Sequence, residues 1–223
     1  MIKASLFTVS FAGDAPWMPF LLRSTAKHVT GFHEHVIAIP NRDYHIFNRF
    51  GLTKEKIVTF DESGFKNGFM AHQYYVMLAD HFCSGDVVVN VDSDCIFTSP
   101  VTPETYTDGD KCVNLCTKYG ATCDSPWRPG VENLLQRSVE YEFMRRHGNT
   151  YPINLYAKLR ERVSDVHNKT LAEIIQPMGR AANFSEFNCL GAYGYISCQK
   201  SSGSSILIWS LSHQIQSISR GPI

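Results

Sequence analysis

The sequence has no apolar run that approaches the ~20 residues needed to span a bilayer, so we expect no transmembrane segment. Its first residues, MIKASLFTVSF, are too few and too strand-like for a secretory signal peptide, because no apolar stretch followed by a small-residue cleavage site occurs there. The sequence alone therefore favours a globular chain that is neither inserted in a membrane nor exported.

Net charge is also absent, because Lys and Arg together number 21 and so do Asp and Glu. A protein that binds nucleic acid or an anionic membrane surface in bulk usually carries an excess of basic residues. The balance therefore excludes nucleic acid as the expected partner. Apolar residues make up 43% of the 223 residues, which is enough to build a core and argues against disorder.

The seven cysteines include no CxxC pair. The nearest cluster, at Cys112, Cys116 and Cys123, has no histidines at zinc-finger spacing. An odd number of cysteines without a pairing pattern is typical of free thiols in a reducing compartment. We therefore expect a cytoplasmic location, in the cell that makes or hosts the protein.

Apolar strands and amphipathic helices alternate along the first hundred residues. Such alternation predicts an α/β domain, with a mostly parallel sheet covered by helices on both faces. The expected strands cover residues 4–11, 35–40, 56–61 and 87–91, and the expected helices lie within 13–29, 42–51 and 69–82.

The second half is less regular. A strand is expected at 111–116, and the sequence NLLQRSVEYEFMRRH predicts a helix over 133–147, with Leu134, Val139 and Phe143 on its apolar side. Further helices are expected within 151–167 and 169–178. The Ser-rich tail after 198 is consistent with a strand that docks late on the sheet or with the edge of an incomplete domain.

The motif DSD, at Asp92 to Asp94, follows the apolar strand VVVNV. About 0.5 D-x-D triplets are expected by chance from eleven aspartates, so the motif alone is only a hypothesis. A second triplet, at Asp108 and Asp110, serves as an internal comparison. It has Gly between its acids and no apolar strand before it, which predicts a solvated turn.

Asp92 and Asp94 are placed where an α/β sheet binds ligands, at the carboxyl end of a strand. Strand alternation would point both carboxylates the same way, with Ser93 opposed. Two close carboxylates favour a cation between them, and Mg²⁺ or Mn²⁺ takes one or two carboxylates together with substrate phosphates. We therefore expect a metal that links the protein to a diphosphate. The alternative is a turn in which Asp92 caps the backbone and Asp94 is solvated.

Two enzyme classes place D-x-D after an apolar strand. In phosphatases of the haloacid-dehalogenase type, the first Asp is the nucleophile and the second a general acid. That motif normally lies on the first strand and is followed by further metal-binding acids, whereas here it follows about 90 residues of α/β pattern. The phosphatase therefore remains the less favoured reading.

The other class fits better. The segments VVVNVDSDCIFTSP, HQYYVMLADHF, SPW and FSEFNCLGAYGY together resemble small nucleotide-sugar glycosyltransferases of the GT-A fold, of the single-domain type found in bacteria and large algal viruses. The resemblance runs from about Ser5 to Tyr195. It implies one Rossmann-like GT-A domain over 1–223, with a nucleotide-binding half (1–100) and an acceptor-side half (101–223), and it leaves open that the C-terminus is incomplete.

The resemblance also implies roles for individual residues in the first half. Ser10 to Asp14 would lie against the nucleotide base and ribose, and Gln73 would reach toward the donor. Asp92 would contact the ribose or a metal-bound water, with Ser93 beside it, and Asp94 would coordinate Mn²⁺ or Mg²⁺ on the donor diphosphate.

In the second half, Glu186 and Asn188 of SEFN would face the transferred sugar or the acceptor hydroxyl. Glu186 is the expected catalytic base, although FSEF also reads as Ser185 capping a helix that starts with an acid. Trp127 could stack on a sugar ring or pack as an ordinary buried tryptophan. His213 is the expected additional metal ligand.

The remaining histidines, His33, His35, His72 and His81, are expected to be ordinary core or surface residues. The function that follows is metal-dependent transfer of a sugar from a nucleoside diphosphate, with a UDP-sugar favoured, to a hydroxyl acceptor such as a glycan. A non-catalytic module that only binds the sugar nucleotide is the alternative from a different class.

Overall fold

The computed structural model describes residues 2–52, 54–120, 126–144, 148–180, 183–200 and 206–210. Its centre is a five-stranded sheet with the strand order β3-β2-β1-β4-β8. The first four strands run parallel, and β8 adds antiparallel to β4 at the edge. The strands are β1 (Ala4–Val9), β2 (Glu34–Pro40), β3 (Glu55–Phe60), β4 (Val87–Asn90) and β8 (Asn149–Pro152).

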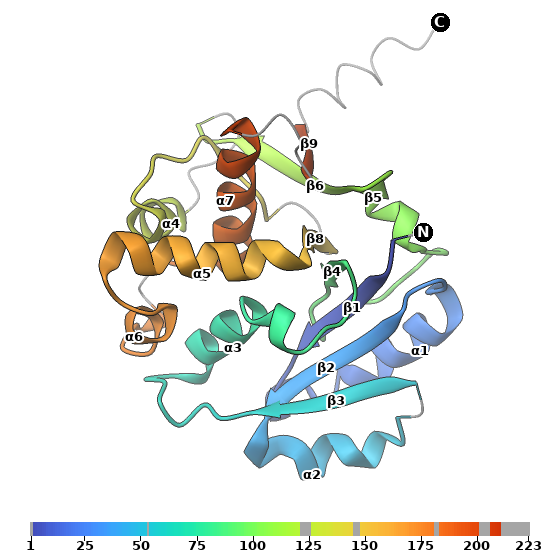
Figure 1. The fold of residues 1–223 in the computed structure, drawn as a ribbon. Helices are drawn as coiled ribbons and strands as arrows, with labels where there is room; N and C mark the ends of the chain where they lie inside the picture. Colours follow the sequence, from blue (N-terminus) through green and yellow to red (C-terminus); the bar gives the residue numbers. More distant parts are fainter. Residues whose placement is uncertain are drawn as a thin grey trace, which may run out of the picture.

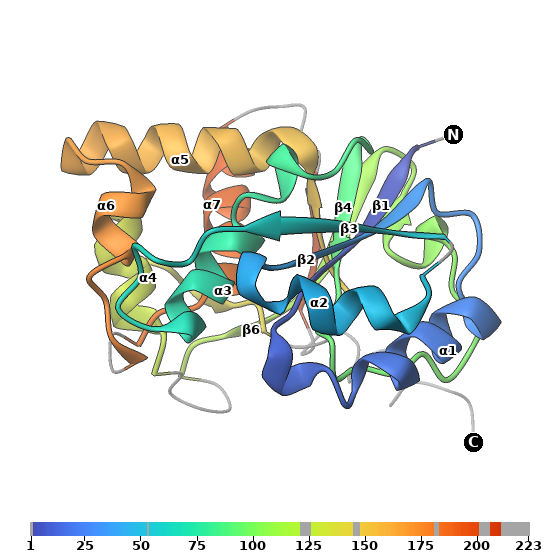
Figure 2. The same ribbon diagram turned by 90° about the horizontal axis from the view of Figure 1, so that it is seen from below.

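Helices cover both faces of this sheet, which confirms the expected α/β class with a mixed, mostly parallel sheet (Figures 1 and 2). Leu6, Ile37 and Val89 pack toward α1 and α2, whereas Phe7, Val36 and Val88 pack toward α3, α5 and α7. Neighbouring residues of a strand point to opposite faces of the sheet. Both sets are buried because helices cover each face. The helices are α1 (Met18–His28), α2 (Tyr44–Phe47), α3 (Gly68–Val76), α4 (Arg128–Leu135), α5 (Ile153–His167), α6 (Leu171–Ile175) and α7 (Glu186–Lys200).

A smaller second sheet is built around β6 (Lys111–Lys118). It also contains β5 (Thr107–Asp108), β7 (Tyr141–Glu142) and β9 (Ile206–Ser210), of which β9 pairs parallel to β6. The tail segment ILIWS is thus a strand that docks on this second sheet. Asp108 ends β5, and Gly109, with φ 60°, and Asp110 form the turn to β6; all three are exposed, as the prediction of a solvated turn required.

The predicted helix over 133–147 is wrong. Helix α4 ends at Leu135, because Gln136 adopts the left-handed conformation with φ 48°, and the chain then enters β7. Leu134, Val139 and Phe143 are buried as expected, although they belong to different segments. The sequence also gave no sign of β8, a four-residue strand directly before α5.

Asn90, the one polar residue of β4, has a structural reason for its place. Its Nδ2 donates to the backbone oxygen of Asn149 at 3.0 Å and to the Tyr156 hydroxyl at 2.9 Å. The side chain therefore ties β4 to the edge strand β8 and to α5. Buried polar groups are tolerated when they are hydrogen-bonded in this way.

The five cysteines whose side chains the structure describes are all unpaired, and four of them are buried. This agrees with the expectation of free thiols, while the cytoplasmic location stays a prediction. Within the described ranges, no helix is both long enough and apolar enough to cross a membrane.

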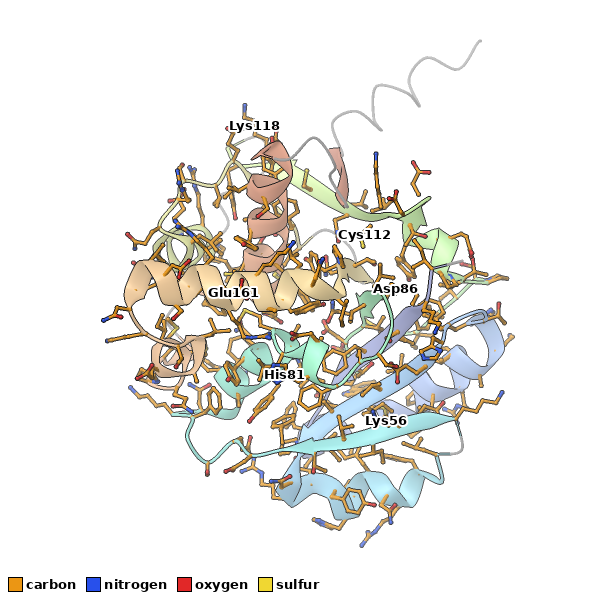
Figure 3. The ribbon with its side chains drawn as sticks, viewed as in Figure 1. Lys56, His81, Asp86, Cys112, Lys118 and Glu161 are labelled. Atoms are coloured by element: carbon orange, nitrogen blue, oxygen red, sulfur yellow. The ribbon has the colours of Figure 1, made fainter. Side chains whose placement is uncertain are left out.

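His81 lies at the end of the short 3₁₀ turn Ala79–His81 that follows α3, next to α5 (Figure 3). Its Nε2 is 3.1 Å from an Arg160 nitrogen, and Arg160 also forms two hydrogen bonds with Asp80, at 2.6 and 2.7 Å. His81 is therefore an ordinary structural histidine, as expected.

Candidate functional site

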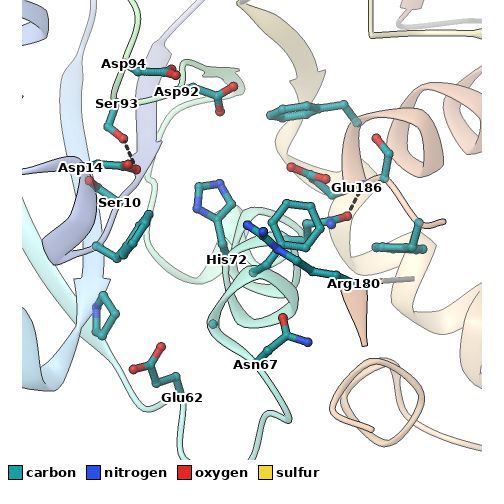
Figure 4. Close-up of a pocket in the computed structure, with 18 of the residues that line it drawn as sticks. Ser10, Asp14, Glu62, Asn67, His72, Asp92, Ser93, Asp94, Arg180 and Glu186 are labelled. Carbon is teal, nitrogen blue, oxygen red and sulfur yellow. Dashed lines mark hydrogen bonds between the residues drawn. The ribbon is translucent and has the colours of Figure 1, made fainter. Parts of the chain in front are cut away.

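A cleft of about 750 Å³ opens at the carboxyl ends of the four parallel strands. Each strand contributes lining residues at its end or just beyond it: Ser10, Phe11 and Asp14 after β1, Pro40 and Arg42 at β2, Phe60 and Glu62 at β3, and Asp92 to Asp94 after β4. Helix α3 and the first turn of α7 form the opposite wall (Figure 4). This edge is where open α/β sheets bind their ligands.

The two aspartates of the DSD motif both line the cleft, but strand alternation does not place them there. Strand β4 ends at Asn90, and the Cys95 backbone N–H donates to the Asp92 carbonyl at 3.1 Å. Residues 92–95 therefore form a turn. Ser93 lines the same cleft as the two acids, so its expected opposed direction does not remove it from the site.

Ser93 and Asp14 connect the ends of two neighbouring strands. The Ser93 hydroxyl, which is buried, donates to the Asp14 carboxylate at 2.7 Å. This bond fixes the DSD turn against the segment that follows β1. Ser10 also lies in this part of the cleft, and its buried hydroxyl has no hydrogen-bond partner among the described residues. Such a group is available to a ligand.

Gln73, on α3, is almost fully buried in the wall of the cleft. Its Oε1 accepts a hydrogen bond from the Glu186 backbone N–H at 3.2 Å. The side chain therefore anchors the start of α7 to α3, two elements 113 residues apart in sequence. Nothing in its contacts supports the predicted reach toward a donor.

Glu186 begins α7 and lines the cleft, with 7% of its surface exposed. Ser185 also caps this helix, because its hydroxyl accepts from the Asn188 backbone N–H at 3.3 Å. The two readings of FSEF are therefore compatible. Burial raises the pKa of the Glu186 carboxyl to about 8, the nearby charge of Asp92 adds to the rise, and the backbone N–H of Glu186 opposes it.

Asn188 lies outside the lining of the cleft. Its side-chain oxygen accepts from the Phe143 backbone N–H at 2.7 Å, and the residue is buried under β7. It ties α7 to the segment that follows β7, so a direct contact with substrate is not supported. Trp127, by contrast, lines the cleft as a half-buried residue at the start of α4. His213 lies outside the described residues.

His72 was not expected in the site. It lies on α3 and points into the middle of the cleft (Figure 4). Burial lowers its pKa, while the charges of Asp92, Asp14 and Asp94 act in the opposite direction. A sequence signal existed, because Phe69, His72 and Gln73 have the i, i+3, i+4 spacing of one helix face.

The charge of the cleft is mostly negative. Its lining includes the carboxyl groups of Asp14, Glu62, Asp92 and Asp94, and that of Glu186, which is neutral below about pH 8, against two arginines and one histidine. No group of three or more His, Cys, Asp or Glu side chains within the described ranges is placed to hold a metal ion by itself. Two carboxylates in an open cleft still fit Mg²⁺ or Mn²⁺, since these ions complete their shell with phosphate oxygens and water.

No protein-family model matches this sequence, and comparison with curated proteins gives no match. The fold and the site by themselves define an α/β domain with a mostly parallel sheet, compatible with a Rossmann-like fold, and an acidic cleft at the carboxyl edge of that sheet.

Proposed function

We propose that this protein is a metal-dependent glycosyltransferase, which moves a sugar from a nucleoside diphosphate to a hydroxyl acceptor. The observation that supports it most is the meeting of Asp92 and Asp94 with Glu186 in one cleft, although they come from opposite halves of the chain. The cleft volume of about 750 Å³ is within the usual range for a small-molecule site. The GT-A resemblance agrees with this assignment.

In this proposal, Asp92 and Asp94 hold Mn²⁺ or Mg²⁺ together with the donor diphosphate. The ion, when bound, neutralises the charge that develops on the leaving diphosphate. The hydrogen bond from Ser93 to Asp14 keeps the turn that carries both aspartates in place. The unpartnered hydroxyl of Ser10 is available to the nucleoside.

Glu186 takes the proton of the acceptor hydroxyl while the sugar–phosphate bond breaks and the new glycosidic bond forms. A general base is most effective when its pKa lies near the working pH, and burial brings the pKa of Glu186 to about 8. Because only the ionised form accepts a proton, the rate of transfer should rise with pH up to about that value.

The first test is calorimetric titration of UDP-glucose and GDP-mannose into the protein, with Mn²⁺ and then with EDTA. We expect one donor to bind only with the metal, and Asp94→Asn to lose this binding. Asp110→Asn is the matched control, because it changes the same residue type in the exposed D-x-D turn. Binding that survives in Asp94→Asn and in EDTA would contradict the assignment of the DSD turn.

The second test separates an enzyme from a binding module. Glu186→Gln should lower transfer by about 10²- to 10⁴-fold, the usual contribution of a general base, while donor affinity stays within a few-fold. A module without turnover would show donor binding and no transfer even in the wild type. Phosphate release from a phosphomonoester that Asp92→Asn abolishes would support the phosphatase instead.

A further inference from the structure

The two arginines of the cleft differ in whether a carboxylate already pairs with their charge. Arg42 is paired with Glu62, with 2.6 Å between Nη2 and Oε1, and it also lies 3.7 Å from Asp43. Its charge is therefore compensated before any ligand arrives. Arg180 forms no ion pair with any other residue in the part of the chain that the structure describes, although five carboxyl groups line the same cleft.

The side chain of Arg180 extends from the segment before α7 across the cleft (Figure 4). Its guanidinium lies 4.9 Å from the centre of the Phe69 ring, on α3. Arg180 lines the same cleft as His72 and Glu186. A guanidinium that contacts a ring in this way keeps N–H groups that can donate to other partners.

The guanidinium of Arg180 thus contacts Phe69, while its N–H groups donate to no acceptor among the residues that the structure describes. Guanidinium groups match phosphate oxygens in a bidentate geometry, and they remain charged at every accessible pH. A diphosphate that enters the cleft meets mostly carboxyl groups, which repel anions when ionised. Few cationic side chains in the lining can compensate its charge.

We propose that Arg180 binds the diphosphate of the ligand from the α7 side of the cleft, while Phe69 holds the guanidinium in position for it. This inference rests on the proposed function, since it assigns a second contact to the same donor. Arg180 would share the negative charge of the diphosphate with the ion on Asp92 and Asp94, and it would stabilise the leaving group without gaining or losing a proton.

The chain provides a matched control for this geometry. Arg23 lies over Phe20 of α1 with the same guanidinium-to-ring distance of 4.9 Å, but neither residue lines the cleft. Both arginines thus make one cation–π contact on a helix. Substitution of either removes an arginine from such a contact, and only Arg180 should affect binding.

The experiment measures the affinity of UDP and GDP, and of uridine and guanosine, for wild type, Arg180→Ala, Arg180→Lys and Arg23→Ala in the presence of Mn²⁺. For the nucleoside diphosphate that binds, Arg180→Ala should weaken affinity by about 10- to 100-fold, the loss typical of a charged hydrogen bond. Affinity for the matching nucleoside should be unchanged. Arg180→Lys should recover part of the loss, and Arg23→Ala should bind like the wild type.

Any other result contradicts either the role of Arg180 or the proposed function. If Arg180→Ala binds the diphosphate as well as the wild type does, or loses nucleoside affinity to the same extent, the role of Arg180 is wrong while the proposed function stands. If the wild type binds neither UDP nor GDP, with or without Mn²⁺, the proposed function fails and this inference fails with it. Unchanged thermal unfolding of the variants verifies that they are folded.

Discussion

At the scale of single residues, two buried titratable groups dominate how this protein should respond to pH. Glu186 and His35 are each at least nine-tenths buried, and burial favours the neutral form of each side chain. It therefore raises the pKa of Glu186 and lowers the pKa of His35. They therefore give stability contributions of opposite pH dependence.

Glu186→Gln tests the first of these groups. The folded state keeps the Glu186 proton up to about pH 8, whereas the unfolded chain loses it near pH 4.5. Between these values the free energy of unfolding should fall as the pH rises, by at most about 1.4 kcal/mol per unit. Urea denaturation from pH 5 to 8 should show a shallower fall for Glu186→Gln, and identical slopes for both proteins would show that Glu186 is ionised when folded.

His35→Gln tests the second group. His35 lies in β2, its Nε2 is 3.1 Å from the Thr8 hydroxyl, and burial lowers its pKa to about 4. As the pH falls from about 6.5 to 4, the unfolded chain takes up a proton that the folded chain does not, so stability is lost. The variant should lose less stability than the wild type over this window in urea denaturation, while the exposed control His45→Gln should behave like the wild type.

At the scale of elements, the first hundred residues were predictable and much of the rest was not. Strands β1 to β4 are apolar runs separated by amphipathic helices, and this local pattern is sufficient to assign them. Strand β8 has only four residues and is defined by its pairing with β4, about 60 residues away. Such long-range pairing leaves no local signal.

The candidate site shows the same division. Asp92, Asp94 and Glu186 could be named from motifs, because each follows or begins a recognisable element. Arg180 and Glu62 reach the cleft only through the tertiary fold, and the sequence around them has no distinctive spacing. The burial of Gln73 against α7 was likewise invisible, since its partner is the backbone of a residue in the other half.

Helix α7 depends on a glycine in its middle. A Cβ atom added at Gly191 would lie 2.3 Å from Cγ and 2.7 Å from Cβ of the Phe143 side chain. These atoms are too near the backbone to move easily. Gly191→Ala should therefore destabilise the fold by about 1–2 kcal/mol, because overpacking outweighs the better helix propensity of alanine.

Chemical denaturation of Gly191→Ala beside Gly179→Ala is the measurement. No atom lies within 4 Å of a Cβ added at Gly179, so that variant should unfold like the wild type. A stabilised Gly191→Ala would mean that the space between α7 and β7 is larger than the structure shows.

At the scale of the whole molecule, the two sheets are joined by a side chain that forms the pair of backbone hydrogen bonds a neighbouring strand would form. Asn114, on β6, donates from Nδ2 to the Thr150 carbonyl at 2.5 Å and accepts from the Thr150 N–H at 3.0 Å. Asn114 and Thr150 are both buried, so neither backbone group has water as a substitute. The second sheet is thereby attached to β8, the edge strand that pairs with β4 in the main sheet.

Asn114→Leu should leave both Thr150 backbone groups without partners in the interior. Each buried unsatisfied group costs about 1–3 kcal/mol, so the free energy of unfolding should fall by about 2–6 kcal/mol. Asn114→Asp should also be destabilised, because a carboxylate retains the acceptor but cannot donate to the Thr150 carbonyl. Asn41→Leu, at an exposed position, is the control. Urea denaturation followed by both far-ultraviolet circular dichroism and tryptophan fluorescence measures the loss, and it also reports whether the halves still unfold together: a wild-type midpoint for Asn114→Leu would show that the two sheets are held by packing alone.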